Sequence, residues 1–419
     1  MRTLGPCLAA CLVLRLVVAM PASAQPSGVA ADAPRGQLLL IGGSERDNNR
    51  LIWDEVVRLA GGPGSSIAVF PTASNNPVRT GNLYALQLER LGLKPFVVPA
   101  SPLLKDRDYR QMARDPQWVE RVRNADAVFL TGGEQVRYRQ VLVDAEGQNT
   151  PLLDAIWHVY RKGGLVMGTS AGMAVMSRVM FIDADLVLNV MLDGANLRRE
   201  VHAGLGLMPN DWFVDQHFLT RGRFGRTLVA MQTYDFPFAI GIDEDTAVVI
   251  EAARSARVIG YRGAVFVDAS KATRDPNESR FNVRGVRLSY LSHDDQYDLV
   301  TREVKLGPEK KPEDLIDPSA PGFKPYHPYR QFHNDILANT RLLDVMVQLV
   351  DSPWEEAIGL AFSLNSARQN AETPGFEFRF YRTGETKSWE SATAIGDAYT
   401  VLNVFLDVRP ITVRGPLYK

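Results

Sequence analysis

Short apolar runs alternate with amphipathic helical stretches in the first half of the chain, and this alternation constrains the fold most strongly. The runs are nearly continuous in Leu, Ile, Val and Phe rather than alternating between apolar and polar residues. Strands of that kind are covered on both faces, as in a parallel sheet built from βαβ units. The pattern therefore predicts an α/β fold with a doubly wound, mostly parallel sheet. The runs are residues 37–41, 66–70, 94–98, 127–130 and 164–167.

The sequence changes character after about Val265. A chain of 419 residues exceeds the usual size of a single core, so a second region is expected. Residues 305–328 have the composition of an exposed loop, whereas residues 332–350 have helical periodicity. Residues 376–381 and 399–408 alternate as in an antiparallel strand pair. The predicted regions are an α/β domain over 36–265 and a C-terminal extension of mixed α/β structure over 266–419.

The first residues have the features of a signal peptide. Arg2 provides a positive charge, residues 8–20 are almost entirely apolar, and residues 22–24 have small side chains in the Ala-x-Ala pattern. The apolar stretch is shorter than the ~20 residues that a membrane-spanning helix needs. We therefore predict a signal peptide over 1–24, a linker over 25–35, and secretion without a membrane anchor.

Composition narrows the possible chemistry. Cys7 and Cys11 both lie in the predicted signal peptide, so the secreted protein would contain no thiol and its nucleophile must be an oxygen. The formal net charge of −1 lacks the basic excess that is typical of proteins that bind nucleic acids. We expect no nucleic-acid partner, no metal and no cofactor.

The turn after residues 164–167 has the features of a nucleophile elbow. Ser170 is flanked by Gly168, Ala171 and Gly172. An elbow strains the backbone at the nucleophile, and only small neighbours fit around it. A buried strand before the turn and a small-residue helix start after it favour an elbow over an ordinary tight turn. We predict that Ser170 is the nucleophile.

A second glycine turn, at Gly132 and Gly133, follows the run at 127–130. Parallel strands end at the same edge of a sheet, so backbone amides from this turn and from Ala171 can point to one place. An oxyanion hole is built in that way. We therefore predict Gly132, Gly133 and Ala171 as its donors, with a plain β-to-α turn as the alternative.

His217 is the best candidate for the general base among six histidines, because it ends an apolar strand at 212–218. The sequence pattern identifies the third member of the triad, an acidic residue, less clearly. Glu244 follows the strand at 238–242 and belongs to the same sheet end, so we choose it as the third member. The alternatives lie between the predicted nucleophile and base, and they are Asp183, Asp185 and Asp193.

Three arginines follow the predicted base within nine residues: Arg221, Arg223 and Arg226. They could form a solvated face. Placed behind a base, they could also bind substrate carboxylates, because a guanidinium grips a carboxylate with two parallel hydrogen bonds.

Four motifs in this order resemble the cyanophycinases, which belong to a serine peptidase family that includes aspartyl dipeptidase and has a class I glutamine-amidotransferase-like fold. The resemblance extends from about Gly36 to Gly260 and implies Ser170 as nucleophile and His217 as base. The motifs are residues 168–172, 204–207, 214–218 with the arginine tail, and 241–246. The substrate contacts that the resemblance implies come from Gln135, Asp215, Gln216, Arg221, Arg223 and Arg226.

The resemblance implies cyanophycin as the substrate. This polymer is a poly-aspartate backbone with arginine on each β-carboxyl, and cyanophycinases release β-Asp-Arg dipeptides from it. Family members can also draw the third triad residue from the segment before the histidine, so Asp185 and Asp193 stay open beside Glu244. Two other functions are an Asp-specific dipeptidase of the same family and a non-catalytic exported binding protein. The sequence leaves the oligomeric state open, with a homodimer among the alternatives. It also leaves open the role of the extension and the groups that bind the substrate guanidinium.

Overall fold

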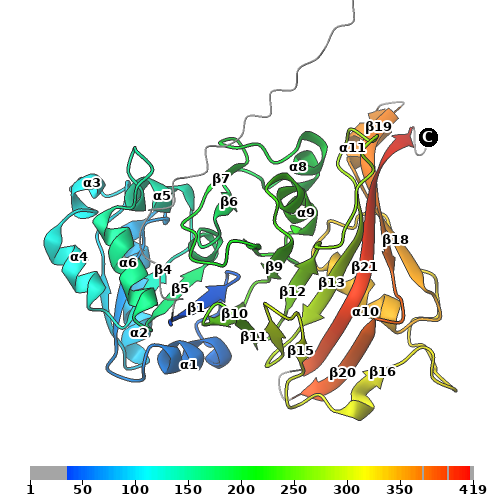
Figure 1. The fold of residues 1–419 in the computed structure, drawn as a ribbon, viewed down its shortest axis with the longest axis horizontal. Helices are drawn as coiled ribbons and strands as arrows, with labels where there is room; N and C mark the ends of the chain where they lie inside the picture. Colours follow the sequence, from blue (N-terminus) through cyan, green and yellow to red (C-terminus); the bar gives the residue numbers. More distant parts are fainter. Residues whose placement is uncertain (1–34, 370–371, 394–395, 416–419) are drawn as a thin grey trace, which may run out of the picture. The chain divides into compact units, whose positions relative to one another are not determined.

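The predicted apolar runs form five adjacent strands of a β-sheet (Figure 1). The computed structural model describes residues 35–369, 372–393 and 396–415, so the predicted signal peptide and all but the last linker residue lie outside the described residues. Five strands run in parallel, and antiparallel strands extend the sheet beyond the first of them. In spatial order the strands are β15 (Val304–Lys305), β14 (Gln296–Asp298), β11 (Ser255–Gly260), β10 (Thr246–Glu251), β1 (Gln37–Ile41), β5 (Leu165–Thr169), β4 (Ala127–Leu130), β2 (Ser66–Phe70) and β3 (Lys94–Val97).

Helices cover both faces of this sheet, which confirms the predicted α/β class (Figure 1). Trp53 and Val56 of one helix are buried against one face, and Leu152 and Ile156 of another are buried against the opposite face. Because β1, β2, β4 and β5 are covered on both faces, they have no polar face, and their sequences are therefore continuous apolar segments. The helices are α1 (Arg50–Leu59), α2 (Pro77–Arg90), α3 (Tyr109–Met112), α4 (Pro116–Arg123), α5 (Val136–Leu142) and α6 (Pro151–Arg161).

A second, mostly antiparallel sheet contains the C-terminal part of the chain. The predicted antiparallel pair is confirmed, with Phe378 opposite Val408. The strands in order are β17 (Phe332–His333), β18 (Glu356–Phe362), β19 (Glu372–Tyr381), β21 (Gly396–Arg414), β13 (Val283–Leu291), β12 (Ala264–Asp268), β9 (Phe238–Ile242) and β8 (Trp212–Gln216). Two further strands lie off this path, β20 (Lys387–Thr393) and β16 (Leu315–Ile316).

The hydrogen-bonded sheets do not follow the predicted boundary near residue 265. Strands β8 and β9 come from the predicted α/β domain but pair into the second sheet, through β9 and β12. In the other direction, β14 comes from the predicted extension and pairs with β11 of the first sheet. The two predicted regions therefore share both sheets, and the boundary at 265 stays a prediction.

One predicted helix is shorter than its periodicity indicates. The helix expected over 332–350 begins at Arg341 and ends at Val350 as α10. Thr340 has a φ of 58°, a left-handed conformation that a helix cannot contain, and Phe332 pairs with β18 instead. The remaining elements are α7 (Ala171–Ala174), β6 (Val179–Phe181), α8 (Val187–Asp193), β7 (Val201–Ala203), α9 (Phe224–Thr233), the 3-10 turn Pro312–Asp314 and α11 (Leu364–Gln369).

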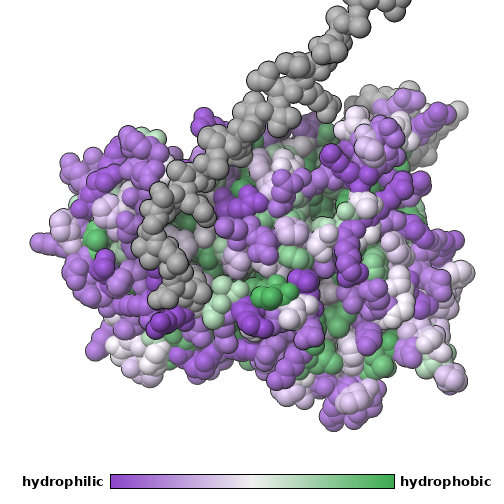
Figure 2. Space-filling model, viewed as in Figure 1, coloured by the Kyte–Doolittle hydropathy of each residue, from purple (hydrophilic) through white to green (hydrophobic). Residues whose placement is uncertain are grey.

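The surface seen in Figure 2 is mainly hydrophilic, with apolar side chains in small separate areas. Within the described ranges no helix combines the length and the apolar character that a membrane crossing requires.

The two sheets meet at the ends of their strands. The amide of His217, after β8, donates to the carbonyl of Gly42 after β1 at 2.9 Å. The amide of Asp245, after β9, donates to the carbonyl of Gly43 at 2.9 Å. The amide of Ser170, after β5, donates to Ile41 at 3.0 Å. The carboxyl ends of β1, β5, β8 and β9 thus converge, which is where ligand sites of open α/β sheets lie.

Candidate active site

Ser170 occupies a strained turn between β5 and α7. Its φ of 51° and ψ of −114° lie in a region that non-glycine residues rarely adopt. The turn requires small neighbours, because a Cβ at Gly168 would lie 2.2 Å from the carbonyl oxygen of Gly172. A Cβ at Gly172 would lie 2.0 Å from the carbonyl oxygen of Leu130. The backbone conformation and the crowding are those of a nucleophile elbow.

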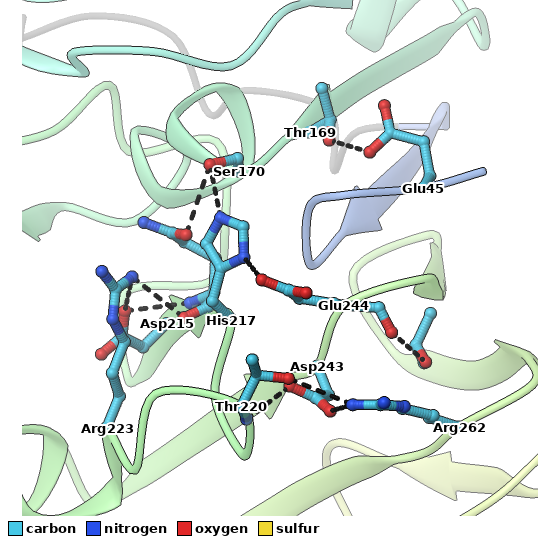
Figure 3. A network of polar contacts seen from close by, with 12 residues as sticks. Glu45, Thr169, Ser170, Asp215, His217, Thr220, Arg223, Asp243, Glu244 and Arg262 are labelled. Carbon is cyan, nitrogen blue, oxygen red and sulfur yellow. Dashed lines mark hydrogen bonds and ion pairs between the residues drawn. The ribbon is translucent and has the colours of Figure 1, made fainter. Parts of the chain in front are cut away.

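A serine, a histidine and a glutamate form a hydrogen-bonded chain (Figure 3). The Oγ atom of Ser170 lies 2.9 Å from Nε2 of His217, and Nδ1 of His217 lies 2.6 Å from Oε1 of Glu244. His217 is only 5% exposed, and its ring packs on Gly43, where a Cβ would lie 2.4 Å from Cε1. With Nδ1 donating to the carboxylate, Nε2 is free to accept a proton from the serine hydroxyl.

The hydrogen bonds of the two neighbouring acids, Asp243 and Asp245, fix the backbone position of Glu244. Asp243 is fully buried and accepts hydrogen bonds from the amide of Thr220 at 2.9 Å and from Arg262 at 2.8 Å (Figure 3). Asp245 accepts from Asn49 at 2.8 Å and from the amide of Arg46 at 3.0 Å. These bonds fix the turn, so that of the three consecutive acids only Glu244 meets the imidazole.

The alternative acids make contacts other than with the imidazole. Asp185 has a side chain that is 84% exposed and pairs with Arg223 at 3.1 Å. Asp193 lies 4.0 Å from Arg199, and Asp183 is exposed. The structure brings Glu244 to His217 and does not bring these three there.

The imidazole of His217 has a lowered pKa, chiefly because burial disfavours the charged ring and secondly because Arg221 is near. A general base must be neutral, so kcat/KM falls as the pH drops through this pKa. We therefore expect the acid limb of the pH profile below the ordinary histidine value of 6.5. Arg221→Gln should move that limb to higher pH, because the substitution removes a positive charge that opposes protonation. Profiles of kcat/KM for both proteins test this, and a limb that stays in place would contradict it.

The predicted oxyanion donors lie beside the serine. A Cβ on Gly132 would lie 3.3 Å from Cβ of Ser170, and Gly133 has a φ of 135°, which suits glycine. Ala171 is the first residue of α7, where helical amides have no partner in the helix. Among the described residues, no backbone acceptor is recorded for the amides of these three residues.

A polar cleft of about 270 Å³ opens above the serine and the histidine. Gln135 lines it and donates to the carbonyl of Phe181, and the side-chain oxygen of Gln216 lies 3.3 Å from Oγ of Ser170. Arg221 lines the cleft and is exposed. Arg223 is buried, and it donates to the carbonyl of Gln216 at 3.0 Å.

Asp215 and Arg226 form a buried ion pair instead of facing the cleft with free charges. Each is 2% exposed, and Nε and Nη2 of Arg226 donate to the two carboxylate oxygens at 2.8 and 2.6 Å. Arg226 also donates to Ala184 at 2.8 Å, and Thr227 donates to Asp215 at 3.2 Å. Arg226 nevertheless lines the cleft, so the contact of these two residues with substrate stays a prediction, made by two groups whose charges already compensate each other.

Arg226→Gln is expected to lower the free energy of unfolding by about 3–5 kcal/mol, because it leaves the carboxylate of Asp215 buried without its counter-charge. Denaturant titration measures this change. Arg90→Gln, on the exposed side of α2, is the matched control and should cost less than about 0.5 kcal/mol. Equal stabilities of the two variants would contradict the structural role of the pair.

Sequence reasoning missed the half-buried carboxyl of Glu45, which stands next to the elbow (Figure 3). Thr169 donates to Glu45 at 2.5 Å and Tyr84 donates to it at 2.8 Å. Burial raises the pKa of this carboxyl. The available signal was an acidic residue directly after the Gly42-Gly43 strand end, at the sheet edge that carries the triad.

The sequence pattern of peptidase family S51 matches residues 38–258, just over half of the chain. The chain belongs to peptidase family S51. This S51 peptidase is 32% identical over 283 residues to a cyanophycinase of Geminocystis herdmanii, covering 65% of this chain and 97% of that one. It is also 32% identical over 282 residues to a cyanophycinase of a Nostoc species, covering 65% and 88%. A crystal structure of a peptidase from an acI-B1 Actinobacterium matches with a TM-score of 0.44 and 24% identity, over 55% of this chain and 90% of that one.

Proposed function

We propose that this S51 peptidase is a secreted cyanophycinase that hydrolyses cyanophycin to β-Asp-Arg dipeptides through an acyl-enzyme on Ser170. The observation that carries the proposal is the hydrogen-bonded chain from Ser170 through His217 to Glu244. The similarity to the cyanophycinases of Geminocystis herdmanii and a Nostoc species supports it. Among the described residues, Asp185 pairs with Arg223 and Asp193 lies near Arg199, whereas Glu244 is the acid that is hydrogen-bonded to the imidazole.

The first step is attack of the Ser170 hydroxyl on the carbonyl of an aspartyl peptide bond. His217 takes the hydroxyl proton at Nε2, and Glu244 stabilises the resulting imidazolium through Nδ1. The new C–O bond forms as the carbonyl π bond opens, and the oxygen becomes an anion. The amides of Gly132, Gly133 and Ala171 are the donors nearest to the serine that can receive this charge.

The second step completes the hydrolysis. When the tetrahedral intermediate collapses, the C–N bond breaks and His217 gives its proton to the leaving amine. Water then attacks the ester on Ser170, with His217 again acting as base. Ser170 and His217 return to their starting states, so the cycle consumes one water for each bond that is cleaved.

Substrate recognition is assigned to the charged groups that line the cleft. Each repeat of cyanophycin carries a free carboxylate and a guanidinium on its arginine. Arg221 lines the cleft and is exposed, so its guanidinium can bind the carboxylate with two hydrogen bonds. Arg223 also lines the cleft, and it fixes Gln216 by donating to its carbonyl. Glu134 and Asp185 line the same cleft and are exposed, which makes them candidates for the guanidinium.

Secretion rests on the predicted signal peptide. Cyanophycin is an insoluble reserve polymer, so an enzyme outside the cell would act on material that other cells release. Sequencing the N-terminus of protein recovered from the medium tests this, and a start at Gln25 is expected. An intact Met1 on protein retained in the cytoplasm would contradict secretion.

A substrate panel tests the function itself. Purified cyanophycin and a set of Asp-X dipeptides are incubated with the protein and with Ser170→Ala as the control, and soluble products are identified by mass spectrometry. Release of β-Asp-Arg from cyanophycin by the wild type alone is the expected result. Cleavage of Asp-X dipeptides without action on cyanophycin would favour the Asp-specific dipeptidase. Binding of cyanophycin without any product would favour the non-catalytic binding protein.

A further inference from the structure

A second cavity, of about 540 Å³, shares a wall with the catalytic cleft. Gln135 lines the cleft, and Arg139, one turn later along α5, lines the second cavity. In the hairpin of β6 and β7, Phe181 lines the cleft and His202 lines the second cavity. The bond from Gln135 to Phe181 joins the two parts of this wall. The second cavity therefore lies directly behind the cleft.

Arg139 is a half-buried charge without a recorded counter-ion. No hydrogen bond or ion pair is recorded for its guanidinium among the residues that the structure describes, and burial lowers its pKa. An unpaired charge taken out of water is costly, so a site of this kind favours an incoming anion. Asp144 also lines the cavity, but its carboxylate already pairs with Arg114 at 3.1 Å.

The cavity also offers a group of opposite charge. Glu146 lines it, is exposed and has no recorded partner among the described residues. A ligand with a carboxylate at one end and a cation at the other would match Arg139 and Glu146 together. A simple anion such as phosphate would match only Arg139.

We propose that this cavity is a second subsite for the polymer, in which Arg139 binds the carboxylate of an arginyl arm and Glu146 its guanidinium. The inference rests on the proposed function. Gln135 at the cleft and Arg139 at the second cavity are four helical residues apart. Four residues of helix rise about 6 Å, which is the length of roughly two residues of an extended backbone. With the scissile bond at Ser170, we therefore expect the arginyl arm of a unit about two residues further along the polymer backbone to enter the second cavity.

Arg139→Gln tests the subsite with two substrates, the polymer and the two-unit segment (β-Asp-Arg)₂. The segment has only one unit on each side of the scissile bond, so it lacks the unit two residues away that would enter the second cavity. We expect KM for the polymer to rise about tenfold, as for loss of one charged hydrogen bond, with kcat unchanged. Kinetics on the two-unit segment should not change. The melting temperature should stay the same or rise, because the substitution removes an uncompensated charge. Arg90→Gln is the control, an exposed arginine that lines neither cavity.

The outcomes separate this inference from the proposed function. If the wild type cleaves both substrates and Arg139→Gln cleaves the polymer with an unchanged KM, only the subsite is overturned. An equal loss on both substrates would also overturn it, because the residue would then act on the catalytic cleft. If the wild type cleaves neither substrate, the proposed function fails and the subsite fails with it.

Discussion

Replacing Ser170 with alanine is expected to lower kcat on cyanophycin by at least about 10⁴-fold while the protein stays folded. The substitution removes one oxygen, the atom that forms the acyl bond, from a turn whose conformation the surrounding backbone fixes. Alanine fits the same space, so the free energy of unfolding should not fall. Product release followed by mass spectrometry measures the activity, and circular dichroism measures the fold.

Residual activity within tenfold of the wild type would show that another group is the nucleophile. A loss of structure together with the loss of activity would leave the chemistry unassigned, so the melting temperature of Ser170→Ala has to be measured in the same preparation. Thiol reagents should have no effect on protein that begins at Gln25, because both cysteines lie in the predicted signal peptide.

Glu244→Gln is expected to lower kcat by roughly 10³- to 10⁴-fold. The amide keeps the shape of the carboxylate but loses the negative charge that stabilises the imidazolium, and it can donate to Nδ1 of His217 and so favour the wrong tautomer. The fixed turn around Glu244 should keep the variant folded, because Asp243 and Asp245 make its anchoring bonds.

Asp185→Asn is the matched control for that experiment, because Asp185 is one of the alternative acids and its side chain is 84% exposed. A kcat for Asp185→Asn that stays close to the wild-type value is expected, with any effect appearing in KM through substrate contact. If Asp185→Asn lowered kcat as much as Glu244→Gln, the assignment of the third residue would be wrong.

The nucleophile turn could be predicted from sequence because its chemistry is local. Gly168 and Gly172 lie so close to neighbouring backbone that only small residues fit within two positions of Ser170. The motif can therefore be recognised in a short stretch of sequence. His217 and Glu244 could be placed at the same edge because each follows an apolar strand, and parallel strands end together.

The second sheet could not be predicted in the same way. Strands β8 and β9 have the same buried pattern as the strands of the first sheet, so periodicity alone cannot say which sheet each joins. Their pairing with β12 and the antiparallel strands of the C-terminal part depends on contacts between distant residues. The base and the acid therefore come from the second sheet, whereas Ser170 comes from the first.

The roles of the charged residues near the site could not be predicted from sequence alone either. A run of three arginines after the base is compatible with a substrate clamp, a solvated face or an internal pair, and the sequence cannot choose among these. In the structure Arg221 is exposed at the cleft, whereas Arg226 is buried on Asp215. Glu45 was missed because no recognisable motif surrounds it, and its contact with Thr169 at the elbow arises only when β1 and β5 pair.

Trapping the acyl-enzyme is the measurement that tests the central claim most directly. The protein is mixed with (β-Asp-Arg)₂, quenched in acid within one turnover, digested, and analysed by mass spectrometry, with Ser170→Ala treated in parallel. The account predicts one β-Asp-Arg unit on the peptide that contains Ser170, and no adduct in the alanine variant. An adduct on another residue, or product formation by the wild type without any covalent adduct, would contradict the account.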